Sequence, residues 1–321
     1  MSRDSAVPPP VTAVLDASST WLPARLGRVE EVLRELSRGH GEPLAGDAGT
    51  TLAAGGKRMR PLLVLICGGA AAGEEVERAA TAIELVHMAT LVHDDVLDAA
   101  PLRRGRPTVA ASGGRGRATA TGDLLFSRAF ALLAERRELR QIALLAEASV
   151  ALARGELAQR HDAHDRTIDE RRYLERCRLK TGKLFECACL LGADTEDLAA
   201  FGAGIGLAFQ LLDDVLDIAG PASRTGKARG TDLLDGTVTL PLILAAEADP
   251  EVAAADLRAL DSPAAEARCD RIAATGALER VRSRALELVE RAKRGLDAAP
   301  IDPERRRLLA LAADGVVKRY G

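Results

Sequence analysis

The sequence predicts an all-α protein, folded as a single-domain helical bundle. Apolar residues recur at helical spacing along most of the chain, and no alternation of period two is long enough for a sheet. Hydrophobic residues make up 47% of the chain but aromatic residues only 2%, so the core must consist mainly of aliphatic side chains. At 321 residues the chain is long for one domain, yet no linker divides it.

The N-terminal part divides into a tail and two helical segments. Residues 1–20 are polar and proline-rich at their start, and we expect a flexible tail there, with the folded domain covering 21–321. The pattern predicts a helix over 21–38, which the Gly39-His40-Gly41 sequence ends. A second helix should begin at Leu62, directly after the segment Gly55-Gly56-Lys57-Arg58-Met59-Arg60-Pro61, because proline is favoured in the first helical turn.

The remaining chain predicts further helices separated by short polar or glycine-rich loops. A Thr181-Gly182 pair lies inside one of them, where it should weaken the helix and can expose a backbone carbonyl. The predicted helices cover residues 79–98, 118–135, 140–159, 170–191, 196–218, 241–248, 263–275, 277–296 and 303–319.

Composition excludes several classes of function. The formal net charge of −3 gives no reason to expect nucleic-acid binding. The five cysteines lie mostly in apolar segments without zinc-site spacing, which favours reduced, buried thiols. The polar N-terminus does not resemble a signal peptide, and no uncharged apolar run is long enough to span a membrane. We therefore expect a cytoplasmic protein.

The most informative motif is His93-Asp94-Asp95-Val96-Leu97-Asp98. Residues four apart share a helix face, so Asp94 and Asp98 should project together, with Asp95 beside them. Three carboxylates at the C-terminal end of a helix repel one another and meet the negative end of its dipole. A positive group must therefore compensate them.

The same motif returns at Asp213, Asp214 and Asp217, again at the end of an apolar helix. One such trio could be a solvated helix end. Two trios flanked by leucine and valine predict the facing halves of a site for Mg²⁺, which prefers carboxylate oxygens and is usually shared with substrate phosphates.

Two basic segments accompany the acidic motifs. The first is the segment that ends at Pro61; its glycines, cations and following helix N-terminus favour a phosphate group, although a basic surface turn remains the alternative. The second, Arg103-Arg104-Gly105-Arg106-Pro107-Thr108, directly follows the first acidic motif. Metal-held and arginine-held phosphates could therefore share one cleft, which points to chemistry on diphosphates.

Five motifs together resemble the trans-isoprenyl (polyprenyl) diphosphate synthases, in the order found in that family. They are GGKRMRP at 55–61, HDDVLD at 93–98 with RRGRPT at 103–108, KT at 180–181, FQLLDDVLD at 209–217 and GTVTLP at 236–241. The resemblance extends from about residue 25 to the C-terminus. It implies an all-α bundle of the isoprenoid synthase type around a deep cavity, usually a homodimer, which condenses isopentenyl diphosphate with an allylic diphosphate using Mg²⁺.

The resemblance also implies roles for individual residues. Asp94, Asp98 and Asp213 would be the main metal ligands, with Asp95, Asp214 and Asp217 supporting them. Isopentenyl diphosphate would be held by Lys57, Arg60, His87 and Arg104, and the allylic diphosphate by Arg103, Lys180 and Lys227. The oxygens of Thr181 and Gln210 would face the developing cation.

One departure from the family concerns Thr237, which stands where many relatives have a lysine, so one contact to the allylic diphosphate is missing. The segment 185–209 is also shorter than the resemblance leads us to expect.

Product length depends on the helix that leads to Asp94. Positions one, two and three turns earlier are Ala89 and Thr90, Val86, and Ala82 with Ile83, and none is aromatic. An aromatic residue five positions before the first aspartate blocks growth in short-chain relatives. We therefore expect a product of twenty carbons or more.

Two other functions remain open at this point. A class I terpene cyclase shares the fold and the first acidic motif, but it normally carries an Asn/Ser/Glu triad in place of the second. A non-catalytic partner subunit of a heteromeric prenyl synthase can lose its aspartates, whereas this chain keeps all six.

Overall fold

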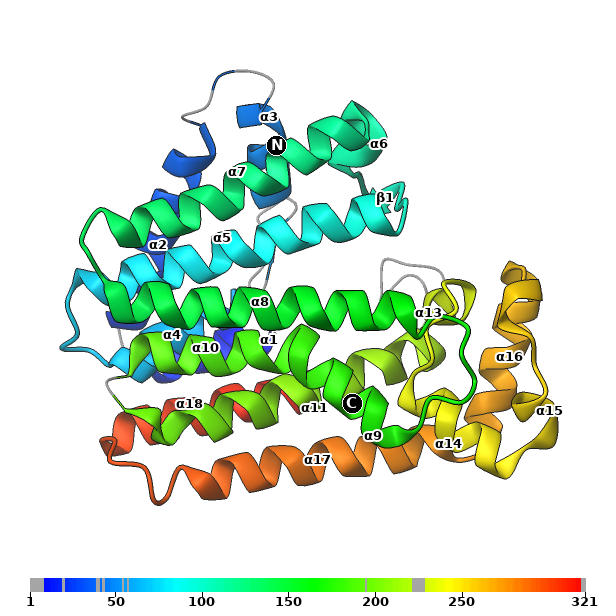
Figure 1. Cartoon of the computed structure of the whole chain (residues 1–321). Helices are drawn as coiled ribbons and strands as arrows, with labels where there is room; N and C mark the ends of the chain where they lie inside the picture. The colour runs from blue at the N-terminus through cyan, green and yellow to red at the C-terminus, as the bar shows by residue number, and fades with distance from the viewer. Residues whose placement is uncertain are drawn as a thin grey trace.

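The fold is almost entirely helical, which confirms the predicted class (Figure 1). The computed structural model describes residues 9–18, 21–38, 41, 44–53, 55–56, 58–193, 195–220 and 229–318. Within them, the described helices are α1 (Pro9–Ala17), α2 (Trp21–Arg38), α3 (Leu44–Ala53), α4 (Met59–Gly68), α5 (Glu74–Leu97), α6 (Val109–Gly113), α7 (Arg115–Ala134), α8 (Leu139–His161), α9 (Glu170–Cys177), α10 (Lys183–Gly192), α11 (Ala199–Ala219), α13 (Thr231–Leu234), α14 (Leu240–Ala248), α15 (Pro250–Ala253), α16 (Ser262–Ala274), α17 (Ala277–Gly295) and α18 (Pro303–Lys318).

Three short helical segments and a small hairpin complete these elements. A π-helix, η1 (Arg178–Gly182), joins α9 to α10, and 3₁₀ turns precede α11 (η2, Glu196–Leu198) and α16 (η3, Leu257–Ala259). The two-residue strands β1 (Leu102–Arg103) and β2 (Arg106–Pro107) pair antiparallel in the described part of the chain, with Leu102 opposite Pro107. The second basic segment therefore forms a tight hairpin directly after α5.

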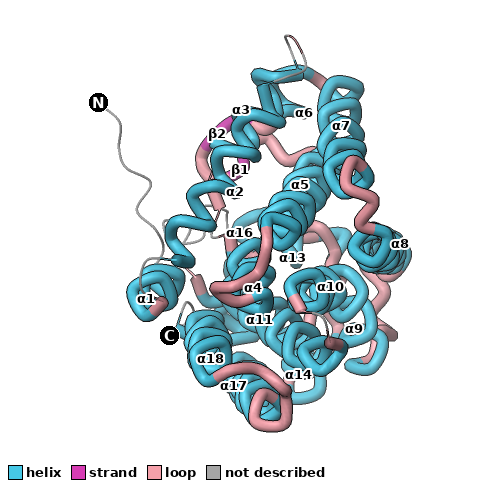
Figure 2. Tube along the Cα trace, turned by 90° about the vertical axis from the view of Figure 1, so that its left-hand side faces the viewer, coloured by secondary structure: helices cyan, strands magenta, loops and turns pink. Residues whose placement is uncertain are grey.

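The long helices lie side by side and enclose one core (Figures 1 and 2). α10 packs between α4 and α11, while α5 packs on α4 and α7, and α11 packs on α17. The buried side chains form one continuous cluster that extends from α1 to α18. Aliphatic residues dominate it, and Tyr173 and Phe185 are the largest fully buried side chains among the described residues.

Several sequence-based boundaries were right and others were wrong. The helix predicted over 21–38 has those bounds, and the helix predicted to start at Leu62 begins three residues earlier, at Met59. α3 was not predicted, because its sequence is short and rich in glycine and threonine. The five cysteines are free and buried, as expected.

The flexible tail expected over residues 1–20 was wrong for Pro9–Ala17, which forms α1. Val11 and Val14 of this helix are buried, and α1 packs against α18, beside which it lies in Figure 2. These apolar residues are three apart, so they share a helix face that the bundle covers. The rest of the expected tail, apart from Ser18, lies outside the described residues.

Among the described residues, one stretch, Glu196–Ala219, is long and apolar enough to cross a membrane. Its most apolar window is 56% buried inside the protein, and α11, which makes up most of the stretch, packs against α10 and α17. Its length and composition therefore reflect a core helix of the bundle.

The contact between α10 and α11 depends on a glycine. A Cβ atom at Gly202, in the first turn of α11, would lie 2.6 Å from the Phe185 carbonyl oxygen and 2.8 Å from the Glu186 Cα. Both neighbours are backbone atoms of α10, which cannot move aside cheaply. A side chain at this position would push the two helices apart.

We expect Gly202→Ala to lower the free energy of unfolding by about 2 kcal/mol or more, because overpacking a helix contact is costly. The matched control is Gly27→Ala in α2, where a Cβ atom meets nothing within 4 Å. That change should raise stability by up to about 1 kcal/mol, the difference in helix propensity. Chemical denaturation of both variants measures the two effects, and equal effects would contradict the predicted close contact.

Candidate active site

The two acidic motifs lie at one cavity of about 260 Å³. α5 and α11 end on the same side of the bundle, where β1 and α13 follow them (Figure 1). α8, α9 and η1 supply much of the remaining wall, and α4, α10 and the segment before α14 complete it. Of the sequence-predicted site residues, the following line it: Arg60, His87, Asp94, Asp98, Arg103, Lys180, Thr181, Gln210, Asp213 and Asp214.

In the first motif, Asp94 and Asp98 line the cavity, as their four-residue spacing predicted. The pKa of Asp94 is raised to about 6, chiefly by burial; Lys180 opposes this shift, and the nearby charges of Glu156 and Asp98 add to it. Asp98 forms an ion pair with Arg160 of α8. The carboxylate of Asp94 is therefore short of positive charge in a partly dry site.

Asp95 does not line the cavity with its two neighbours. Its carboxylate is buried and accepts a hydrogen bond of 2.8 Å from the Arg103 Nε atom. This ion pair fastens the β1–β2 hairpin to the end of α5, so the structure gives Asp95 a structural contact and Arg103 a fixed place at the cavity wall.

In the second motif, Asp213 and Asp214 line the cavity, whereas Asp217 is not among the lining residues. Asp217 instead accepts a hydrogen bond of 3.2 Å from the backbone N–H of Asp232, at the start of α13. Burial, then Asp232 and Asp213, raise the pKa of Asp214 well above its usual range. Ionisation of Asp214 is therefore disfavoured in the protein alone, and a nearby cation would favour it.

A chain of hydrogen bonds joins η1 to α11 across the cavity wall. The Thr181 hydroxyl donates to Gln210 Oε1 at 2.7 Å, and Gln210 Nε2 donates to Asp214 Oδ1 at 2.8 Å. On the other side, the buried Tyr173 hydroxyl donates to Asp214 Oδ2 at 2.5 Å. Thr181 and Gln210, predicted to act together, are thus in direct contact, and this network fixes the orientation of Asp214.

Lys180 is positioned by the π-helix η1 and by α8. Its ammonium forms an ion pair with Glu156, a largely buried residue of α8. The adjacent Gly155 allows this approach, since a Cβ atom there would lie 2.5 Å from the Lys180 backbone nitrogen. The weakening expected at Thr181-Gly182 is seen as the π-helix, in which Lys183 N–H donates to the Arg178 carbonyl five residues earlier.

Several cations act on His87, which also lines the cavity. Burial lowers the pKa of His87 well below 6.5, and the charges of Arg60, Arg104, Arg103 and Arg58 lower it further. Arg60 stacks over the Phe185 ring with its Cζ atom 4.6 Å from the centroid, and its Nε atom has no hydrogen-bond partner. Burial lowers the pKa of Arg60 to about 10, so it stays charged at neutral pH. Arg60 therefore has positive charge available for an anion.

The remaining predicted phosphate ligands are two lysines and one arginine. Lys57 and Lys227 lie outside the described residues. Arg104, in the β1–β2 turn with a positive φ of 52°, is not among the lining residues, but its charge acts on His87. Arg58 of the first basic segment pairs instead with Glu84 at 2.8 Å, a contact that secures the start of α4.

The donor atoms suit a hard cation, but the described residues do not form a ready metal cluster. No three histidine, cysteine, aspartate or glutamate side chains lie close enough together in the described ranges to hold an ion. Asp94, Asp98 and Asp213 nevertheless line the same cavity, and each offers carboxylate oxygens. Burial and neighbouring carboxylates raise the pKa values of Asp94 and Asp214, and a divalent cation shared with phosphate oxygens would favour their ionised forms.

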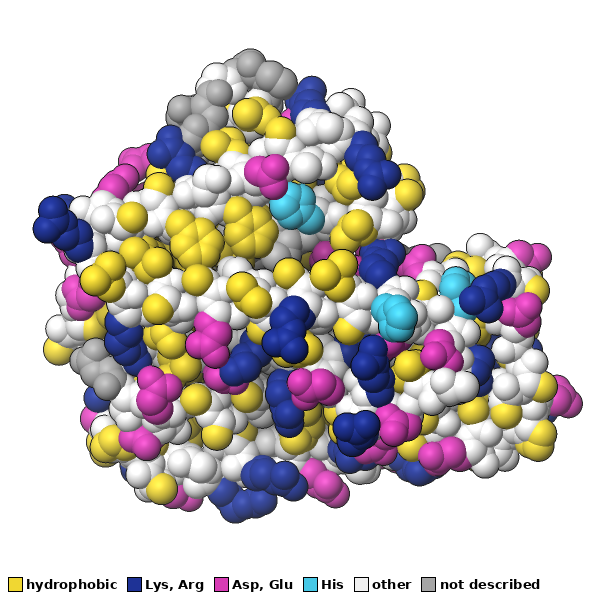
Figure 3. Space-filling view, viewed as in Figure 1, with side chains coloured by type: hydrophobic (Ala, Val, Ile, Leu, Met, Phe, Trp, Pro, Cys, Tyr) yellow, Lys and Arg dark blue, Asp and Glu magenta, His cyan; other side chains and the backbone are white. Residues whose placement is uncertain are grey.

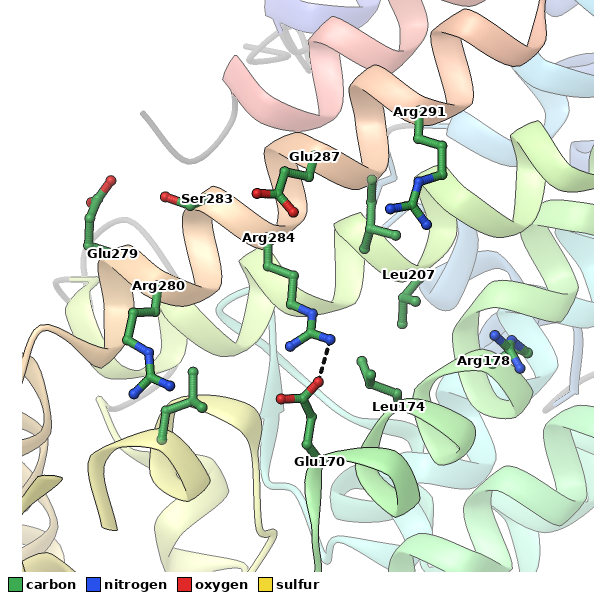
Figure 4. A pocket seen from close by; sticks show the side chains of 12 residues that line it. Glu170, Leu174, Arg178, Leu207, Glu279, Arg280, Ser283, Arg284, Glu287 and Arg291 are labelled. Carbon is green, nitrogen blue, oxygen red and sulfur yellow. Dashed lines mark ion pairs between the residues drawn. The ribbon is translucent and has the colours of Figure 1, made fainter. Parts of the chain in front are cut away.

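A larger hollow of about 680 Å³ lies elsewhere, among α9, α11, α14 and α17. Figure 4 shows leucines in it and arginines and glutamates of α17 along one wall, with an ion pair between Arg284 and Glu170. None of the sequence-predicted site residues lines this hollow, so the smaller cavity is the candidate active site.

Comparison with known proteins supports this assignment. A family model for polyprenyl synthetases matches residues 43–274. The chain belongs to the polyprenyl synthetase family. It is therefore an enzyme that transfers prenyl groups, as the motifs indicated.

Individual members of the family align over most of their length. Heptaprenyl diphosphate synthase component 2 of Geobacillus stearothermophilus is 38% identical over 318 residues, which cover 93% of this chain and 97% of the relative. Octaprenyl diphosphate synthase of Escherichia coli is 35% identical, with coverage of 80% and 84%. A polyprenyl synthase of Caulobacter crescentus, solved with calcium and isoprenyl diphosphate, superposes with a TM-score of 0.90 at 32% identity, covering 97% and 98% of the two chains.

Sequence reasoning missed the residues that hold the predicted ones in place. Glu156 and Arg160 of α8 bind Lys180 and Asp98, and Tyr173 binds Asp214. A usable signal existed for one of them, since Gly155-Glu156 interrupts an otherwise regular helical pattern. Tyr173 offered no such signal, because a lone aromatic residue at a helical position is typical of any core.

We expect His87 to make the protein sensitive to acid. The folded protein keeps this imidazole neutral, whereas the unfolded chain binds a proton near pH 6.5, so the free energy of unfolding falls as pH drops below that value. The contribution reaches about 1.4 kcal/mol per pH unit. His87→Gln should therefore show a shallower loss of stability than wild type between pH 6.5 and 5 in denaturant titrations. Parallel curves for the two proteins, offset by the difference seen at pH 8, would contradict this role.

Proposed function

We propose that this member of the family is a trans-prenyltransferase that condenses isopentenyl diphosphate with an allylic diphosphate by 1'-4 chain elongation. The observation that carries the proposal is one cavity lined both by carboxylates of the two acidic motifs and by Arg60, His87 and Arg103. Carboxylates of this kind suit a metal-bound leaving group, and the cations suit a second diphosphate. The presence of both kinds of group in one cavity suits a reaction between two diphosphates.

Asp94, Asp98 and Asp213 are the proposed main ligands of Mg²⁺, and Asp95, Asp214 and Asp217 would support them. These carboxylates would hold Mg²⁺, which would supply neutralisation of the charge that develops on the departing diphosphate. Lys180, held by Glu156 beside Asp94, adds a fixed positive charge on the same side. We assign the allylic diphosphate to this side, with Arg103 and Lys227 as its other ligands.

Isopentenyl diphosphate is assigned to Arg60, His87 and Arg104. Lys57, which lies outside the described residues, is proposed as its further ligand. The neutral imidazole can donate one hydrogen bond, and the arginines supply the charge. We assign the Thr181 and Gln210 oxygens, which lie together at the cavity wall, to stabilising the positive charge on the allylic carbon. Leu91, Leu152, Leu184 and Phe209 supply the apolar part of the wall, which keeps water from that cation.

The metal requirement provides the first test. The double variant Asp94→Ala and Asp213→Ala should lose at least about a hundredfold in turnover, because electrostatic stabilisation of the leaving group is the dominant catalytic effect. EDTA should abolish wild-type activity, and Mg²⁺ should restore it. The control Asp270→Ala removes an exposed carboxylate of α16 and should leave activity unchanged. Product formation from radiolabelled isopentenyl diphosphate measures these effects, and turnover that survives EDTA would contradict the mechanism.

The product is proposed to contain twenty carbons or more. Relatives bear names from geranylgeranyl to nonaprenyl diphosphate synthase, so the family alone does not decide the length. No aromatic side chain occurs at Ala82, Ile83, Val86, Ala89 or Thr90 of α5. Of these, Thr90 lines the cavity, and Ala89 is fully buried beside it in the sequence.

Thr90→Phe and, separately, Ala89→Phe should shorten the product to fifteen or twenty carbons, since each places a ring one turn from Asp94. Both variants should keep their dependence on Mg²⁺, which shows that the metal site is intact. Mass spectrometry of the products gives the chain length. If the wild-type enzyme already stops at fifteen carbons, the proposed product length is wrong.

We further propose that the enzyme acts as a homodimer in the cytoplasm, with α7 and α8 at the interface. Leu139, Val150 and Leu157 of α8 are 75%, 61% and 70% exposed, and their spacing of eleven and seven residues places them on one helix face. Figure 3 shows a band of hydrophobic side chains across the face over α7 and α8. Such a band on one surface indicates a protein partner, and a second copy offers the same surface.

The double variant Val150→Glu and Leu157→Glu should convert the dimer to a monomer, because it buries charge at the proposed interface. The control Leu286→Glu changes a leucine that is 43% exposed on α17, and it should leave the dimer intact. Light scattering after size-exclusion chromatography measures the mass. A wild-type protein that is monomeric and inactive alone would favour a heteromeric enzyme, for which the component 2 relative is a precedent in name.

A further inference from the structure

Arg176, on α9, carries an incompletely compensated positive charge into the wall of the active-site cavity. Its side chain is only 3% exposed, yet the residue is among those that line the cavity. An arginine side chain remains charged under all ordinary conditions, so burial must be offset by hydrogen bonds and opposite charge. The contacts of each guanidinium nitrogen show whether the protein alone supplies these hydrogen bonds and this opposite charge.

One half of the guanidinium group is well satisfied. Nη2 donates a hydrogen bond of 2.6 Å to the Val238 carbonyl, in the segment before α14 that also places Thr237 and Thr239 at the cavity. The Cζ atom lies 5.5 Å from the centroid of the Tyr173 ring. These contacts fix the plane of the group and hold it against the second acidic motif, to which Tyr173 is bound.

The other half is not satisfied. Nη1 has no hydrogen-bond partner, and its nearest carboxylate oxygen, Asp162 Oδ2, is 3.6 Å away, beyond hydrogen-bond distance. Asp162 is bound instead by Arg172, whose Nη2 donates at 2.8 Å and whose Nε donates at 3.1 Å. One buried carboxylate thus serves two arginines, and Arg172 takes the hydrogen bonds.

Arg176 and Lys180 lie on the same wall. Both line the cavity, and both act on the thiol of Cys177, which stands between them in the sequence. Burial raises the pKa of that thiol to about 12, while the two cations oppose the shift. Two fixed positive charges that converge on one region match an anion with several oxygens better than a single carboxylate does.

We propose that Arg176 is a further ligand of the allylic diphosphate, to which its Nη1 donates a hydrogen bond beside Lys180. The proposal rests on the proposed function, because it assigns the ligand of that cavity. Its new content is that an arginine of α9, outside the five recognised motifs, completes the anion site. The bond to Val238 holds the guanidinium group in place before the substrate arrives.

The test measures diphosphate binding directly, with inorganic pyrophosphate and Mg²⁺ as the probe. Isothermal titration and the rise in melting temperature on adding pyrophosphate are recorded for wild type, Arg176→Met and Arg176→Lys. The control is Arg166→Met. Arg166 is also a partly buried arginine that donates to one backbone carbonyl, Val252, and has an unpartnered Nη1, but it does not line the cavity.

We expect Arg176→Met to weaken pyrophosphate binding at least about tenfold and to raise KM for the allylic diphosphate more than KM for isopentenyl diphosphate. Arg176→Lys should lie between wild type and Arg176→Met, since lysine keeps the charge but not the planar pair of donors. Arg166→Met should bind pyrophosphate as wild type does, even if its melting temperature falls. If Arg176→Met does not fold, the affinity of Arg176→Lys decides.

Two results would overturn the proposal in distinguishable ways. If the folded Arg176 variants bind pyrophosphate like wild type and only their melting temperature falls, Arg176 is structural, and the proposed function stands. If the wild-type protein itself binds no pyrophosphate with Mg²⁺, the proposed function fails and this assignment fails with it.

Discussion

The site depends on how closely α10 and α11 approach each other. Gly202 and Gly206 of α11 have no side chains that would separate the two helices. A Cβ atom at Gly202 would meet the Phe185 carbonyl oxygen, and a Cβ atom at Gly206 would meet the Phe185 Cβ atom. η1, which leads into α10, is thereby brought against the same helix, and Thr181 can touch Gln210. The polar chain that ends at Asp214 therefore follows from an apolar packing constraint. Without the close contact, neither the orientation of Asp214 nor the place of Lys180 would be fixed.

The second organising feature is that carboxylates and arginines of the same cavity are only partly paired with each other. The acidic motifs sit at the ends of apolar helices, where the dipole and burial disfavour negative charge. The protein compensates them only in part, with Arg103 on Asp95 and Arg160 on Asp98. Arginines elsewhere in the cavity keep unpartnered nitrogen atoms. Each half is costly alone, and ligands that carry both phosphate and metal would relieve both.

The sequence predicted the fold class and most helices because their signals are local. Helical periodicity, breakers and acidic spacing all act within a few residues, which is why α2 and the pair Asp94 and Asp98 were placed correctly. Contacts between distant segments left no local signal. The ion pair that turns Asp95 toward Arg103, the hydrogen bond that holds Asp217 near α13, and the partners of Lys180 and Asp214 became visible only in three dimensions. α1 was missed for the same reason. Two valines three residues apart do not by themselves indicate a buried helix face, and the contact of α1 with α18 lies far away in the sequence.

The π-helix has a consequence for how this chain can change. α9, η1 and α10 form one continuous helix with an extra residue in a single wide turn, and beyond that turn every side chain is rotated by about 100° relative to an unbroken α-helix. Point substitutions leave this offset in place, whereas deleting one residue between Arg178 and Gly182 would remove it. α10 would then have to turn its buried face away from α4 and α11, or Arg176 and Lys180 would have to leave the cavity. The number of residues in this segment is therefore constrained more tightly than their identity. Residues can be exchanged there, but none can be inserted or deleted without rotating α10.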